Sequence, residues 1–266
     1  MRVLVTNDDG IDAPGLRALA GAVTGAGHDV VVVAPLDDRS GCGAGMAYTP
    51  GEPVATVEKE FPELPGVPFV GIDGTPALAV MLARIGTFGP PPWCVASGVN
   101  RGSNTGRAIL HSGTVGGALA AASLGMSGIA VSMDSDEPVH VGTAAEVAGY
   151  ATNWLAGARK RTVLNINVPD LSLAEVRGVR WARLAAVGRR VLRADRREGT
   201  GPRVWLDASG LPEDPTTDAQ LLADGYVTVT PVGTLHGLPD NGSAQALDEA
   251  LMCTAPQRRT EEQPDR

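Results

Sequence analysis

Cysteine is scarce in this chain of 266 residues, and long apolar runs are absent from it. The three cysteines, Cys42, Cys94 and Cys253, are an odd number without a Cys-x-x-Cys pair, which argues against a disulfide framework and a zinc knuckle. No run of about 18 apolar residues occurs, as a membrane-spanning helix requires. The opening MRVLVTND reaches acidic side chains too early for a signal peptide. We therefore expect a cytoplasmic protein with no membrane partner.

Positive charge is also scarce. The chain has 22 Lys and Arg residues against 30 Asp and Glu residues, a net charge of −8. A general nucleic-acid surface needs clustered Lys and Arg side chains, so no nucleic-acid duplex is expected as a partner. Hydrophobic residues make up 43% of the chain, and this much apolar surface can offset the entropy cost of ordering. The composition fits a soluble enzyme with a sizeable core.

Before Pro169, short apolar runs without polar alternation are separated by helical patterns. Such runs are typical of a parallel sheet that is covered on both faces. We therefore expect an α/β fold with a Rossmann-like, doubly wound, mainly parallel sheet and helices on both faces. The expected strands are 2–6, 30–35, 69–73, 93–98, 129–133 and 163–168, and the expected helices are 14–26, 77–85, 114–124 and 144–156.

The pattern changes after Pro169. Residues 179–184, 203–207 and 226–232 alternate between apolar and polar side chains, as strands of antiparallel hairpins do. The sequence thus predicts a β-hairpin extension on the C-terminal side of the α/β core.

The segment 189–201 within this extension is strongly basic. It could contact nucleic acid, but a solvated hairpin arm is the favoured interpretation. We predict a single domain over residues 1–253, which includes the arm at about 183–210. Residues 254–266 show no periodicity, which predicts a disordered tail.

Adjacent carboxylates follow the first predicted strand, in the sequence Asn7-Asp8-Asp9-Gly10. Ligands of open parallel sheets bind at the carboxyl ends of the strands. Two neighbouring carboxylates repel each other, and a divalent cation such as Mg²⁺ or Mn²⁺ would compensate them with hard oxygen ligands. An Asx turn followed by a helix cap at Asp9 or Asp12 is the alternative. These four residues alone leave both interpretations open.

Two further polar loops follow strands of the predicted sheet. Ser40, after the second strand, could offer its hydroxyl to a metal or a phosphate, although a serine in a polar turn is common. Residues 97–106 combine glycines with Asn100 and Asn104, and glycine allows backbone and amide groups to approach a ligand closely. A plain surface loop is the alternative, but so many such residues directly after a buried strand favour a site.

The fourth loop, 111–117, opens a helix of small residues. Free N–H groups at a helix start, flanked by Ser112 and Thr114, form an anion site; helix capping is the other interpretation. A cation beside an anion site indicates phosphoryl chemistry. Because Asp8 and Asp9 are adjacent rather than spaced as Asp-x-Asp, we expect direct attack by metal-bound water instead of an aspartyl-phosphate intermediate.

Seven motifs of this chain, in order, resemble the SurE family of survival nucleotidases. They span about residues 1–231, nearly the whole chain. The resemblance implies a metal-dependent phosphatase of nucleoside 5′- and 3′-monophosphates, with a Rossmann-like core and a β-hairpin arm that builds homodimers or homotetramers. The motifs are VTNDDGIDAPGL, APLDDRSG, GTPA, SGVNRGSNTG, HSGTVGGAL, LNINVP and TDAQLLADGYVTVTP.

The resemblance also implies roles for single residues. Asp8, through the cation, belongs to the catalytic set. The implied metal ligands are Asp8, Asp9, Ser40 and Asn100, and the implied phosphate contacts are Asn104, Ser112, Gly113, Thr114 and the backbone at Gly41.

Three departures from the family pattern concern proton delivery. Ala108 stands where an acidic residue is usual, His111 replaces a tyrosine, and Gly233 replaces a histidine. Loss of a general acid typically costs about 10²–10⁴-fold in rate. His111, next to the anion site, is the first candidate for a replacement acid, and His236 is the second, although each alone could be structural.

These observations predict a divalent-metal-dependent phosphomonoesterase whose substrate is a small phosphate ester, a nucleoside monophosphate. Two alternatives remain open. One is a phosphatase specialised for a sugar phosphate or a modified-nucleoside phosphate. The other is a catalytically weak protein that only binds nucleotides. The sequence does not decide between Mg²⁺ and Mn²⁺, or between a dimer and a tetramer.

Overall fold

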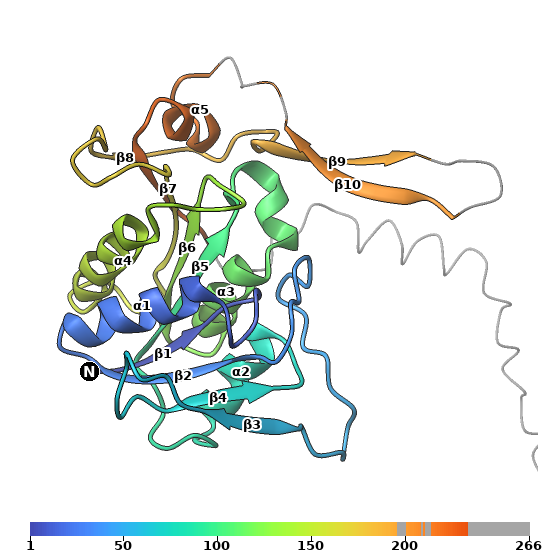
Figure 1. The fold of residues 1–266 in the computed structure, drawn as a ribbon, viewed down its shortest axis with the longest axis vertical. Coiled ribbons are helices and arrows are strands. Elements are labelled where there is room, and N and C mark those ends of the chain that lie inside the picture. The colour runs from blue at the N-terminus through green and yellow to red at the C-terminus, as the bar shows by residue number, and fades with distance from the viewer. Residues whose placement is uncertain (196–200, 209, 211–213, 234–266) are drawn as a thin grey trace, which may run out of the picture. The chain divides into compact units, whose positions relative to one another are not determined.

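A sheet of nine strands organises the part of the chain that the computed structural model describes, residues 1–195, 201–208, 210 and 214–233 (Figure 1). Its strand order is β3-β4-β2-β1-β5-β6-β7-β11-β8. The strands are β1 (Arg2–Thr6), β2 (Asp29–Pro35), β3 (Thr56–Lys59), β4 (Phe69–Ile72), β5 (Cys94–Arg101), β6 (Ser127–Met133), β7 (Val163–Val168), β8 (Val179–Trp181) and β11 (Val227–Pro231).

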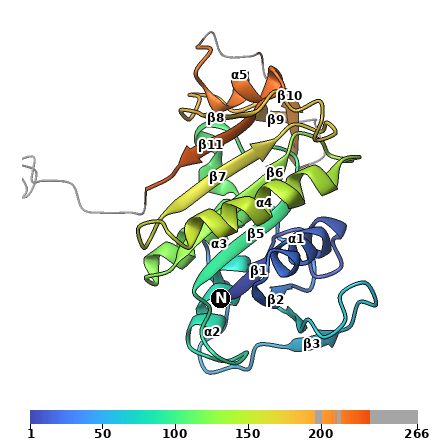
Figure 2. The same ribbon diagram turned by 90° about the vertical axis from the view of Figure 1, so that its left-hand side faces the viewer.

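Helices cover both faces of the sheet, as the sequence predicts. They are α1 (Pro14–Gly25), α2 (Pro76–Arg84), the 3-10 helix η1 (Gly106–His111), α3 (Gly113–Ser123), α4 (Val141–Leu155) and the short α5 (Asp218–Ala223). Helices α1 and α4 pack together on one face (Figure 2), and α2 packs against α3 on the other. The central strands β1, β5 and β6 are buried and pair in parallel with their neighbours. The predicted doubly wound α/β fold is confirmed.

The edges of the sheet differ from the prediction. Strand β3, which the sequence analysis did not predict, pairs antiparallel with β4. Strand β11 is antiparallel to β7, but β8 lies parallel to β11 rather than in an antiparallel hairpin with it. A parallel pair needs a long connection between its strands, and the segment between β8 and β11, which includes α5, provides one.

The predicted hairpin arm is present as a separate two-stranded sheet of β9 (Arg190–Asp195) and β10 (Arg203–Ala208). These strands pair antiparallel and extend from the edge of the core (Figure 1). Residues 234–266 lie outside the described residues, so the single domain to residue 253 and the disordered tail at 254–266 stay predictions. His236 lies in the same undescribed segment. Of the helices that the structure describes, none has the length and apolar character to cross a membrane.

Candidate active site

The turn after β1 buries two carboxylates side by side. Asp8 is 3% exposed, and the side chain of Asp9 is 4% exposed. Asn7 shapes the turn, because its Nδ2 donates to the carbonyl of Gly10 at 3.0 Å, and Gly10 has a φ of +102° that few other residues adopt. The helix-cap alternative is wrong for both Asp9 and Asp12, because the N-cap of α1 is Ala13 and no side chain caps this helix. The carboxylates of Asp8 and Asp9 therefore do not cap this helix and can bind a ligand.

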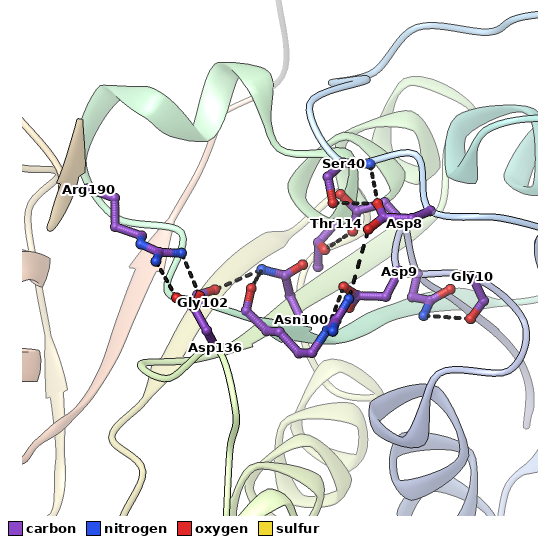
Figure 3. A network of polar contacts seen from close by, with 12 residues as sticks. Asp8, Asp9, Gly10, Ser40, Asn100, Gly102, Thr114, Asp136 and Arg190 are labelled. Atoms are coloured by element: carbon purple, nitrogen blue, oxygen red, sulfur yellow. Dashed lines mark hydrogen bonds and ion pairs between the residues drawn. The ribbon is translucent and has the colours of Figure 1, made fainter. Parts of the chain in front are cut away.

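Asp8 lies against the start of α3. The Gly113 amide donates to Asp8 Oδ2 at 3.1 Å. The Thr114 hydroxyl donates to Asp8 Oδ1 (Figure 3). Position 113 needs glycine, since a Cβ there would lie 2.7 Å from Asp8 Cβ and 2.6 Å from Cys42 Sγ. Burial raises the pKa of Asp8, and these hydrogen bonds offset part of that effect. The positive end of α3 thus already faces one anion, Asp8 itself.

Asp9 is less well compensated. Its Oδ1 accepts from Arg101 Nε at 3.3 Å, whereas its Oδ2 is buried without a hydrogen-bond partner among the described residues. Burial, followed by the charge of Asp8, raises the pKa of Asp9 to about 6. A buried carboxylate oxygen with no partner is costly. A bound cation would satisfy this oxygen, so the pair fits a divalent ion.

Ser40 comes to this pair from the loop after β2. The Arg39 amide donates to the Asp8 carbonyl at 2.7 Å, which ties the loop to the turn after β1. The Ser40 hydroxyl donates to Asp38 Oδ1 at 2.6 Å, so its oxygen lone pairs remain for a ligand. Arg101 Nη2 lies 3.9 Å from Asp38 Oδ2. Neither Asp38 nor Arg101 was predicted as a site residue, although both belong to polar loops that follow strands of the predicted sheet.

Asn100 lies in β5 rather than in a loop, because the strand continues to Arg101. The pairing with β6 shifts in register between Ser97 and Asn100, and such an irregularity re-aims side chains. Asn100 Nδ2 donates to the carbonyls of Arg101 and Gly102, at 3.0 and 2.7 Å (Figure 3). Its Oδ1 therefore keeps its lone pairs for a ligand.

Asn104 is held by two asparagines of β7. The backbone N–H of Asn104 donates to Asn167 Oδ1 at 2.8 Å, and its backbone carbonyl accepts from the side-chain amides of Asn165 and Asn167. Its own Nδ2 donates to Ser132 Oγ at 2.8 Å. No role was predicted for Asn165 and Asn167, yet two asparagines inside a buried strand are a signal that their polar groups need hydrogen-bond partners.

One cavity of about 470 Å³ brings most of the predicted residues together. His111, at the end of η1, lines it, whereas His236 lies outside the described residues. Gly113 and Thr114 do not line the cavity; they donate hydrogen bonds to Asp8, which does. The predicted residues in the lining are Asp8, Ser40, Gly41, Asn100, Asn104, His111 and Ser112, and the hairpin adds Arg190, Leu192 and Leu206.

The donor set suits a hard cation. Nowhere in the described ranges do three His, Cys, Asp or Glu side chains come together as a metal cluster. A cation here would instead need hydroxyl and amide oxygens besides the two carboxylates, and Ser40 and Asn100 provide them. Oxygen donors of this kind favour Mg²⁺ or Mn²⁺ over softer metals.

Comparison with known proteins gives a consistent result. The model of one protein family, described as Survival protein SurE, matches residues 3–190. A 5′-nucleotidase SurE from Pseudomonas entomophila is 37% identical over 242 residues, covering 87% of this chain and 92% of that protein. One from Nitratidesulfovibrio vulgaris is 41% identical over 241 residues, covering 87% and 86%.

The fold leads to the same family. The crystal structure of the SurE protein from Aquifex aeolicus matches with a TM-score of 0.74 and 30% sequence identity. The match covers 95% of this chain and 100% of that one. The resemblance carried by the sequence motifs is therefore confirmed, and the chain belongs to the SurE family.

Proposed function

We propose that this protein is a divalent-metal-dependent phosphatase of nucleoside monophosphates. The observation that carries the proposal is the buried pair Asp8 and Asp9, whose Asp9 Oδ2 has no partner among the described residues, beside a cavity that Asp8 lines. The name 5′-nucleotidase of its SurE relatives supports the same substrate class. The buried acid pair and the similarity to SurE nucleotidases thus support the same proposal.

Four residues would hold the cation: Asp8, Asp9, Ser40 and Asn100. A divalent cation neutralises charge on phosphoryl oxygens and makes a water molecule more acidic. Asp38 orients the Ser40 hydroxyl, and the backbone carbonyls at 101 and 102 orient the Asn100 side chain. Such supporting contacts fix ligands before a metal arrives.

The phosphate would bind at the start of α3. Ser112 lines the cavity and caps α3, since its Oγ accepts from the Val115 amide at 3.1 Å, which leaves the hydroxyl proton free to donate. Gly113 and Thr114 position Asp8 and place the positive end of the helix beside the phosphate. Asn104 and the backbone at Gly41 complete the phosphate contacts.

His111 is the proposed general acid that protonates the leaving oxygen. It lines the same cavity as Asp8 and Ser112, and its carbonyl accepts from the Gly43 amide at 3.1 Å, which fixes the residue against the loop after β2. Ala108, also in the lining, has no proton to give. His236 remains the second candidate. His111→Ala is expected to lower the rate by about 10²-fold for a poor leaving group.

Two isosteric variants test the proposal. Asp8→Asn and Asp9→Asn remove one negative charge each, and both are expected to lose nearly all Mn²⁺- or Mg²⁺-dependent release of phosphate from nucleoside monophosphates. Asp37→Asn, in the loop that carries Ser40 but exposed, is the matched control and should remain active. Unchanged turnover in either site variant, with its circular dichroism spectrum intact, would refute the assignment. Nucleotide binding without phosphate release by the wild type would favour the catalytically weak binding protein.

The assembly belongs to the proposal as well. The hairpin exposes large apolar side chains, among them Val204, 56% exposed, and Trp205, 45% exposed. Exposed apolar patches of this kind mark protein contacts, so we propose that the arm builds a homodimer or homotetramer. Sedimentation of the wild-type chain tests this, and a monomer at micromolar concentration would contradict it.

A further inference from the structure

The hairpin contributes a wall to the cavity that holds the candidate active site. Arg190 and Leu192 of β9 and Leu206 of β10 line it, together with Asp8 and Ser112 of the core. Arg190 and Asp8 lie on opposite sides of Asn100 (Figure 3). The hairpin is therefore part of the site as well as an arm.

The pairing of the strands shows which face forms this wall. Leu192 lies directly opposite Leu206 in the antiparallel register, so both side chains are on one face, with Cβ atoms about 5 Å apart. Trp205 is opposite Arg193, on the other face. Leu192 is 70% exposed and Leu206 is 55% exposed. The face toward the cavity thus presents an apolar platform that is open to a ligand.

Ion pairs hold this platform beside the loop that carries Asn104. Arg190 binds the Asp136 carboxylate with both Nη atoms, one of them at 2.6 Å (Figure 3). Arg189 Nε donates to Asp134 at 2.9 Å, and the Arg189 amide donates to Thr105 Oγ1 at 2.8 Å. The root of the hairpin is therefore fixed relative to the phosphate end of the cavity.

We propose that Leu192 and Leu206 bind the planar base of the nucleotide and set the preference for nucleotides over other phosphate esters. The inference rests on the proposed function. The two parts of the lining differ in chemistry. Around Asp8, the inner end, the core provides carboxylate, hydroxyl and amide groups. The hairpin end has two leucines and an arginine that Asp136 already neutralises. A sugar hydroxyl would find no free partner on the leucines, but a flat, largely apolar ring would cover them.

A matched pair of substrates isolates the base. Adenosine 5′-monophosphate and ribose 5-phosphate share the phosphate and the sugar, and only the first has a base. Combined Leu192→Ala and Leu206→Ala substitutions are expected to lower kcat/KM for the nucleotide by about tenfold, mainly through KM, and to leave ribose 5-phosphate unchanged. Arg193→Ala, on the opposite face of β9, is the control and should keep the wild-type ratio of the two substrates.

Binding of adenosine, the product without phosphate, gives a readout that does not depend on turnover. Calorimetry should show binding to the wild type that weakens about tenfold in the Leu192→Ala, Leu206→Ala variant. An equal loss for both esters, or an unchanged preference for the nucleotide, would overturn the inference. If the wild type hydrolyses neither ester, the proposed function fails, while adenosine binding still decides the role of the two leucines.

Discussion

The two ends of the cavity are built by opposite means. At the inner end, Asp8 is almost fully buried, and the start of helix α3 holds it through the Gly113 amide and the Thr114 hydroxyl. The buried side chain of Asp9 follows it in the chain, outside the cavity lining. At the hairpin end, Leu192 and Leu206 are largely exposed on a two-stranded sheet whose root the Arg190–Asp136 ion pair ties to the core.

This difference separates the residues proposed for the reaction from those proposed to select the substrate. A change at the inner end disturbs buried charge, which costs much in stability and in rate. A change at the hairpin end alters only exposed side chains, which costs the fold little. The leaving group can therefore be selected by residues that the reaction itself does not need, and the following variants test that separation.

The largest effect is expected at Gly113, where the buried Asp8 meets helix α3. Gly113→Ala places a methyl group 2.7 Å from Asp8 Cβ, so either the acid or the helix must shift, and activity should fall more than about 10²-fold. Gly142→Ala, in α4 with nothing within 4 Å of the added Cβ, is the control. Comparable activity in the two variants would show that the geometry around Asp8 is not critical.

A smaller effect is expected at Asp38, which supports Ser40 from outside the cavity. Asp38→Ala removes the acceptor of the Ser40 hydroxyl, and loss of such a support typically weakens metal binding or activity by about 10- to 100-fold. Mn²⁺ titration of the activity measures the change, with Asp37→Ala as the control. An identical Mn²⁺ dependence of the two variants would mean that Asp38 does not orient Ser40.

At the hairpin end, the Arg190–Asp136 pair should affect substrate binding and not chemistry. Arg190→Ala is expected to raise KM for the nucleotide by less than about fivefold, since a partly exposed ion pair contributes little, and to leave kcat unchanged. Exchanging the charges, with Arg190→Asp and Asp136→Arg together, should restore part of the loss. A drop in kcat with KM unchanged would show that the hairpin end takes part in the reaction, contrary to this account.

The smallest effect concerns the stability of the metal-free protein. Burial and the charge of Asp8 raise the pKa of Asp9 to about 6 in the folded chain, whereas an unfolded aspartate has a pKa of about 3.9. Between these values the folded state binds a proton that the unfolded state does not, so stability falls as the pH rises. Tm in a chelator should be a few degrees higher at about pH 5 than at about pH 7.5.

Asp9→Asn removes the group whose pKa is raised to about 6. The variant should lose that part of the pH dependence, and Mn²⁺ should raise the Tm of the wild type most above about pH 6, where Asp9 is ionised. The same pH dependence in the wild type and in the variant would show that Asp9 is not the group concerned.

Local sequence patterns predicted the core of the fold because each element there obeys a local rule. Uninterrupted apolar runs identified β1, β2 and β6 as buried parallel strands, and Pro14 marked the start of α1. The same rules missed β3, whose residues are mostly exposed, and the parallel pairing of β8 with β11. Pairing between distant strands depends on the connecting chain, which periodicity does not describe.

The candidate site divides in the same way. Asp8, Asp9 and Asn100 belong to short motifs, so the sequence located them. Asp38 acts through the direction of one hydrogen bond, and Leu192 meets the cavity only because a hairpin more than eighty residues after Asn104 folds back beside it. Such contacts between distant segments are set by tertiary structure.

The most direct test of the account is a crystal structure with Mn²⁺ and phosphate bound. Anomalous scattering should place one Mn²⁺ ion against the carboxylates of Asp8 and Asp9, within reach of Ser40 and Asn100, with phosphate between this ion and Ser112. A Mn²⁺ peak elsewhere, with Asp9 Oδ2 still without a partner, would contradict the central claim that these buried acids form the metal site.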